Sequence, residues 1–194
     1  MHLPSHWTSY LYIAIAIFVL MYVIVIFNRL VFIKNNAKRS WANIDVLLKQ
    51  RYDELPKLVD TCKQYMQYER DTLEKITKAR AMAVQAREQQ DIQALNKAES
   101  YLQTVLGRLF ALAENYPELK ASETFMHLQN RISSLENQIA DRRELYNEAV
   151  MINNVRIEQF PDLLVALLFG FKHLVPLEFK EERLDVDVNA AFNK

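Results

Sequence analysis

Hydrophobic residues follow two successive patterns along this 194-residue chain: an unbroken run near the start, then a helical repeat. The run covers residues 10–27, and its only polar groups are tyrosine hydroxyls. An α-helix of that length extends about 27 Å, close to the ~30 Å hydrocarbon core of a bilayer. A further apolar turn follows at residues 30–33. The pattern therefore predicts one transmembrane helix over residues 10–33.

The charges beside this run predict its orientation. No Lys or Arg precedes it, whereas four follow within a short stretch: Arg29, Lys34, Lys38 and Arg39. A cleaved signal peptide would instead have a basic start, a shorter apolar core and a small-residue cleavage site. The positive-inside rule then predicts a short extracytoplasmic N-terminus, residues 1–9, and a cytoplasmic domain after residue 33.

Beyond residue 36, apolar residues recur at alternating spacings of three and four, which is typical of coiled-coil-like packing. The first series has ten apolar members among 13 positions, from Trp41 to Ala83, and two further series cover residues 95–116 and 125–149. Polar breaks separate them at residues 87–91 and 115–122. The predicted fold class is all-α: a transmembrane helix followed by an elongated antiparallel three-to-four-helix bundle over residues 34–160. Its helices are expected at about 36–87, 92–115 and 122–159.

Four residues interrupt these series. Pro56 lies inside the first, but the phase is the same on both sides, which predicts a kinked helix rather than two helices. Arg51, Glu69 and Arg142 occupy positions where a core residue is expected, and buried charges are costly unless paired. They either reach solvent at a bundle edge or pair with charges on a neighbouring helix, or they fix register or form a recognition patch.

Two further groups are candidates for packing or interaction. Trp41 and Tyr146 have core spacing, and Asn147 is either a hydrogen-bond partner for another helix or simply exposed. The second group is an apolar segment, residues 161–171, whose residues 163–171 have no charge. Its candidate contacts are Leu164, Leu168, Phe169 and Phe171.

Three interpretations of this apolar segment stay open: a cap on the bundle, a contact with an oligomer or partner, and an interfacial membrane element. An up-down-up bundle would place it far from the membrane, so we expect it to be buried in protein. A loosely ordered tail is expected over residues 172–194.

Composition excludes several function classes. The 24 basic residues equal the 24 acidic ones, unlike the basic footprint of a nucleic-acid binder. The chain has only two Gly residues, too few for a glycine-rich phosphate-binding loop. Cys62 and the four His residues do not have the spacing of metal ligands. The sequence predicts no catalytic, metal or cofactor site and hence a non-enzymatic protein.

Several motifs in order resemble the LemA family. They are found at residues 41–59 (WANIDVLLKQRYDELPKLV), 116–121, 125–129, 142–150, 160–161 and 169–171. The resemblance implies a single-pass protein of the bacterial inner membrane with a helical cytoplasmic domain. It also implies an association with membrane quality control, including membrane zinc proteases. Asn153 departs from the pattern, because the family more often has an aromatic residue there.

Two functional hypotheses follow. The first is a membrane-anchored scaffold that contacts the bilayer through residues 10–33, forms homo-oligomers and acts with other membrane proteins, such as a membrane protease. The second is a membrane sensor or signalling adaptor with Pro56 as its joint. The second is less favoured, because residues 1–9 supply no outer domain.

Overall fold

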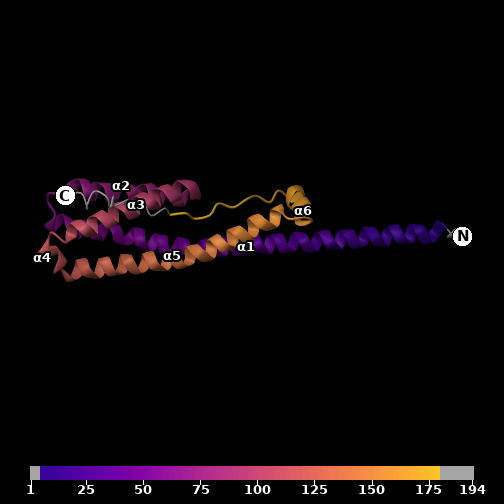
Figure 1. Cartoon of the computed structure of the whole chain (residues 1–194), viewed down its shortest axis with the longest axis horizontal. Helices are drawn as coiled ribbons and strands as arrows, with labels where there is room; N and C mark the ends of the chain where they lie inside the picture. The colour runs from indigo at the N-terminus through magenta and orange to yellow at the C-terminus, as the bar shows by residue number, and fades with distance from the viewer. Residues whose placement is uncertain (1–4, 180–194) are drawn as a thin grey trace, which may run out of the picture. The chain divides into compact units, whose positions relative to one another are not determined.

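The computed structural model describes residues 5–179, and this part of the chain is helical without any strand (Figure 1). This confirms the all-α prediction. Residues 1–4 and 180–194, which include parts of the predicted N-terminal segment and tail, lie outside the described residues. The helices are α1 (Ser5–Tyr65), α2 (Arg70–Glu88), α3 (Ile92–Ala113), α4 (Pro117–Lys120), α5 (Glu123–Glu158) and α6 (Asp162–Phe169).

The chain forms two compact units. One, here the anchor unit, combines Met1–Trp41 with Leu145–Leu174; the other, the bundle unit, combines Ala42–Glu144 with Val175–Lys194. The division falls inside α1 and inside α5, so each of these long helices contributes to both units.

The bundle unit is built on the predicted helical series. Ile44, Leu48, Leu55 and Leu58 of α1 are fully buried, as are regularly spaced residues of three other helices. These include Ile76 and Ala79 of α2, Leu95, Leu102 and Leu109 of α3, and Ile132 and Leu135 of α5. Burying such side chains is the main favourable term in folding, at about 1.5–3 kcal/mol for each large one.

The first predicted helix of the bundle is wrong in one respect, because it does not continue to residue 87. α1 ends at Tyr65, and the chain turns before α2 begins at Arg70. Met66 is completely buried in this turn, and the Glu69 amide donates to the Met66 carbonyl at 3.1 Å. The turn adds one reversal of chain direction, so α1, α2, α3 and α5 form four long helical segments instead of three.

The reversal between α2 and α3 is as expected. Asp91 caps α3 by accepting a hydrogen bond from the Ala94 amide at 2.9 Å.

Pro56 lies inside α1 without ending it, as the unchanged phase predicted. A proline has no N–H and so leaves the carbonyl four residues earlier, that of Tyr52, without its usual helical donor. Here Arg80 of α2 donates to that carbonyl through Nε at 2.7 Å. The proline therefore makes a backbone acceptor available, and α2 uses it.

In the anchor unit, α5 runs antiparallel to α1. Trp41 packs against Tyr146 with ring centroids 5.9 Å apart, whereas Ile157, further along α5, joins a cluster with Ile26 and Leu30, earlier in α1. The C-terminal end of α5 thus lies near the apolar run of α1. The expectation that residues 163–171 lie far from this run is wrong. It assumed an up-down-up bundle and so lacked the reversal of chain direction between α1 and α2.

Candidate interaction surfaces

A buried ionic cluster lies in the core of the bundle unit. The Arg51 guanidinium of α1 is paired with the Glu99 carboxylate of α3, and the neighbouring Tyr52 hydroxyl donates to the same carboxylate. Arg51 and Glu99 are 4% and 2% exposed, and Glu136 of α5 lies 4.0 Å from the other end of the guanidinium. Four side chains from three helices therefore meet at one level of the bundle.

The charges of Arg51 and Glu99 support each other, whereas burial disfavours the charge of Glu136. Burial alone lowers the pKa of Arg51, but the charge and hydrogen bond of Glu99 outweigh it and raise that pKa above its ordinary value. Burial also raises the pKa of the Tyr52 hydroxyl, and the Glu99 charge raises it further, so Tyr52 remains a donor. Burial raises the pKa of Glu136 above its ordinary value, although Arg51 opposes the shift. The cluster is suited to fixing helix register, since a slipped helix would leave a buried charge unpaired.

The other two charged residues of the helical series do not join Arg51. Glu69 is half-buried at the α1–α2 turn, directly before α2, and Arg142 is exposed on α5. Glu99 was not among the predicted residues, because it follows Ala98 and lies off the regular spacing. The charged position of Arg51 was the one signal that a buried acid must exist elsewhere.

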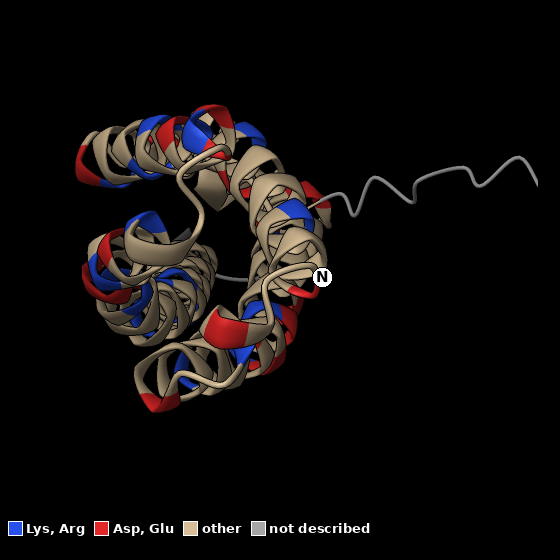
Figure 2. Ribbon diagram, turned by 90° about the vertical axis from the view of Figure 1, so that its left-hand side faces the viewer, with Lys and Arg blue, Asp and Glu red and all other residues tan. Residues whose placement is uncertain are grey.

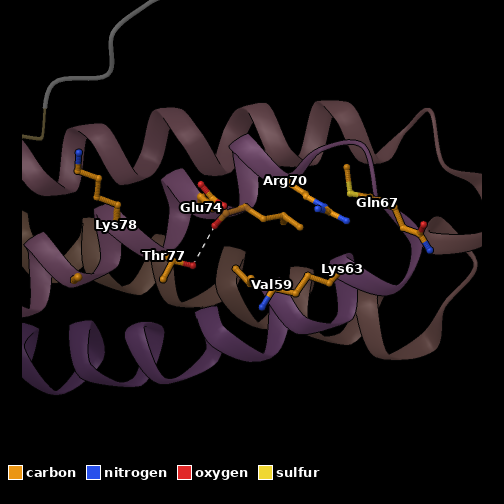
Figure 3. Close-up of a pocket in the computed structure, with 10 residues that line it drawn as sticks. Val59, Lys63, Gln67, Arg70, Glu74, Thr77 and Lys78 are labelled. Atoms are coloured by element: carbon orange, nitrogen blue, oxygen red, sulfur yellow. Dashed lines mark hydrogen bonds between the residues drawn. The ribbon is translucent and has the colours of Figure 1, made fainter.

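A groove of about 730 Å³ lies beside the α1–α2 turn (Figure 3). Val59, Met66 and Leu73 line it with buried apolar side chains, and its remaining lining is polar or small. Figure 3 shows the polar lining residues Lys63, Gln67, Arg70, Glu74, Thr77 and Lys78. Lys63, Arg70 and Lys78 against Glu74 make the lining basic over an apolar floor, with Lys63 also paired to Asp60 at 3.0 Å. Such a lining complements an amphipathic segment that carries acidic residues. Basic and acidic segments are interspersed along the other helices of the bundle (Figure 2).

The apolar segment near the C-terminal end does not bury the residues that we expected. Leu164 and Leu168 are 59% and 75% exposed, whereas Val165 and Ala166 are buried against Ile26. An eight-residue helix can turn only part of its surface toward one neighbour, and in α6 that part faces α1. The described part of the chain therefore leaves Leu164 and Leu168 uncovered, which argues against a cap on the bundle at these two residues.

The two predicted phenylalanines of this segment do contact α1. Phe169 lies against the Phe27 ring with centroids 4.7 Å apart, and Phe171 meets the same ring edge-on at 5.9 Å. Gly170, with φ of 68°, ends α6 in the left-handed conformation that favours glycine.

Residues 172–179, predicted to belong to a loose tail, are held by asparagines. In the anchor unit, Asn154 donates to the Leu174 carbonyl and accepts from the Leu174 amide, both at 2.9 Å. In the bundle unit, Asn96 pairs in the same way with the Pro176 carbonyl and the Glu178 amide, each at 3.1 Å. Neither asparagine was predicted, because hydrogen bonding to an extended backbone leaves no periodic signal.

Cysteine and histidine form no metal-binding cluster in the part of the chain that the structure describes. Cys62 is buried, and burial raises the pKa of its thiol to about 12. No group of three or more His, Cys, Asp or Glu residues within residues 5–179 could hold a metal ion.

Comparison with known proteins gives the family. The model of the LemA family matches residues 40–192, most of the chain. The chain belongs to the LemA family. It is 28% identical over 169 residues to the Protein LemA of Metamycoplasma hominis, a match that covers 86% of this chain and 75% of the relative.

Part of the chain also matches two magnetosome proteins. The chain is 37% identical over 79 residues to Magnetosome protein MamQ 2 of Paramagnetospirillum magneticum, covering 41% of this chain and 29% of the relative. It is 33% identical over 81 residues to Magnetosome protein MamQ of Magnetospirillum gryphiswaldense, covering 42% of this chain and 30% of the relative. The chain therefore matches less than a third of the length of these two relatives.

Proposed function

We propose that this LemA-family chain is a non-enzymatic, membrane-anchored scaffold. The observation that supports this most directly is α1, which begins as a helix long and apolar enough to cross a membrane and continues without interruption into the core of the bundle unit. Only 6% of its most apolar window is buried by the rest of the protein. Side chains so apolar and so exposed are stable in lipid and unfavourable in water.

The scaffold acts through the surface of its bundle. The groove beside the α1–α2 turn takes an acidic amphipathic segment of another membrane protein, with Lys63, Arg70 and Lys78 supplying the complementary charge. Such charges chiefly raise association rate and specificity. Self-association and membrane quality control are further parts of this proposal.

The test is to isolate the full chain in mild detergent, measure the mass of the complex and identify what co-purifies after crosslinking in cells. We expect a mass above that of the monomer and at least one membrane protein among the crosslinked products. The variant Lys63→Glu/Arg70→Glu/Lys78→Glu should lose that protein. A matched variant that reverses exposed cations outside the groove should retain it; its changes are Lys49→Glu, Arg108→Glu and Lys120→Glu.

A monomer without companions would contradict the scaffold proposal. A partner retained equally by both triple variants would contradict the groove as the contact and leave the scaffold in place.

A further inference from the structure

The outer surface of α6 is apolar and uncovered. Five large hydrophobic side chains between residues 160 and 169 are at least half exposed. They are Phe160 (79%), Leu164 (59%), Leu167 (73%), Leu168 (75%) and Phe169 (50%). The one acid of α6, Asp162, is buried, and Arg156 lies 3.5 Å from its carboxylate. The exposed surface of α6 is therefore uncharged.

The inner surface of α6 fixes it against the end of the apolar run of α1. Val165 and Ala166 pack with Ile26 and Leu30 in one buried cluster, and Phe27 packs against it. Figure 1 shows α6 beside α1. Beyond α6, Asn153 donates to the Lys172 carbonyl at 3.4 Å, which holds the chain where it leaves the helix. The position of α6 beside α1 is thus set by the cluster at the middle of α6 and by the backbone that follows its C-terminal end.

The surface of α6 continues the exposed apolar surface of α1. In α1 the large hydrophobic residues that are at least half exposed lie mainly between Trp7 and Val25, directly before the cluster residue Ile26. On the other side, Lys34 lies over the Phe171 ring at 5.6 Å, and Arg29 and Lys172 are exposed. An apolar face bordered by cations is the arrangement of a helix at the boundary between acyl chains and phosphates.

We infer that α6 is an interfacial membrane helix whose Leu164, Leu167 and Leu168 insert into the bilayer leaflet nearest to Leu30. This inference rests on the proposed anchoring of α1. Eight residues extend about 12 Å, too short to cross a bilayer, so α6 lies at the boundary. The bilayer is the occupant favoured over a protein, because the neighbouring exposed residues of α1 need the same apolar surroundings.

The experiment uses the full chain reconstituted in phosphatidylcholine vesicles that contain a lipid with a nitroxide on its acyl chain. In a Cys62→Ala background, a single cysteine bearing an environment-sensitive fluorophore is placed at Leu168 in α6. A second variant, Ile17→Cys, reports on the predicted span. A third, Leu145→Cys, is the control, since Leu145 is 49% exposed in the anchor unit but lies next to Tyr146, the partner of Trp41.

We expect the lipid nitroxide to quench the labels at positions 168 and 17 by similar fractions and to leave the label at 145 unquenched. Aqueous iodide should quench in the opposite order. Quenching by lipid at 17 without quenching at 168 would overturn the inference and leave the anchoring intact. A label at 168 protected from both quenchers would show that protein covers α6 and would also overturn it. No lipid quenching at 17 would overturn the anchoring itself and, with it, the inference.

Discussion

Arg51 lies at a position where the heptad repeat requires an apolar side chain, and the fold accommodates it by burying Glu99 beside it. Two hydrogen-bonding neighbours share the carboxylate, which satisfies both of its oxygens. A pair of this kind stabilises little over a well-packed apolar pair, but it penalises every arrangement that separates its members. The cluster is therefore a specificity device at the residue scale.

Glu99→Leu should lower the free energy of unfolding by about 3–5 kcal/mol, because it leaves Arg51 buried with only the more distant Glu136. The double variant Arg51→Met/Glu99→Leu should recover most of that loss. The measurement is urea unfolding followed by circular dichroism in detergent. A double variant as unstable as the sum of the two single variants would contradict this account.

Glu136 gives a pH dependence of defined sign. Burial raises its pKa in the folded state, so the ionised carboxylate disfavours folding at neutral pH, and protonation removes this penalty as the pH falls. Glu136→Gln should therefore be more stable than the parent at pH 7. This difference in the free energy of unfolding should shrink as the pH falls toward the ordinary pKa of glutamate. Unfolding curves across this range test it, with exposed Glu144→Gln as the control. A difference that grows on acidification would contradict the assignment.

At the scale of elements, the Tyr52 carbonyl links Pro56 to the packing of α2 on α1. Arg80→Met should cost about 1–3 kcal/mol, because it leaves this carbonyl without a donor. In a Pro56→Ala background the new N–H can donate to Tyr52, so the same change should cost clearly less. A double-mutant cycle from unfolding measurements gives the coupling. Equal costs in both backgrounds would show that the proline and the arginine act independently.

Asn154 should control the backbone that leaves α6. Asn154→Ala removes both hydrogen bonds to Leu174, so amide exchange at Leu174 should accelerate by a factor that corresponds to about 1–3 kcal/mol. Asn154→Asp retains the acceptor and should preserve much of the protection of that amide. Hydrogen exchange measured by mass spectrometry distinguishes the two. Unchanged exchange in Asn154→Ala would contradict the role of this side chain.

The sequence predicted which helix faces are buried, and it missed the direction of the later helices. Thr72, Ile76 and Ala79 in α2 continue the spacing of α1, so the repeat passes through the turn at Met66 without a change of phase. Periodicity reports which side of a helix is apolar, whereas direction depends on the number of reversals. One missed turn therefore displaced the apolar segment at residues 163–171 from its true neighbour, Ile26.

At the scale of the whole molecule, the charge pattern around α1 predicts its orientation in the membrane. No Lys or Arg lies in residues 1–9, whereas Arg29, Lys34, Lys38 and Arg39 follow the apolar run. Moving these four cations through the bilayer is unfavourable, so they should remain in the cytoplasm. α5 runs alongside α1 in the anchor unit, which makes Leu145 a reporter for the side of the membrane that carries the cations.

The orientation is tested with a membrane-impermeant maleimide on intact cells, again in the Cys62→Ala background. We expect Ser5→Cys to react in intact cells and Leu145→Cys to react only after the membrane is permeabilised. Replacing the four cations with Gln while adding Ser5→Lys and His6→Lys should reverse or mix the orientation, so that Leu145→Cys becomes reactive in intact cells. A parent chain in which Leu145→Cys reacts and Ser5→Cys does not would invert the assignment. Equal reactivity of both in intact cells would contradict a single orientation, because the two positions flank the one predicted span.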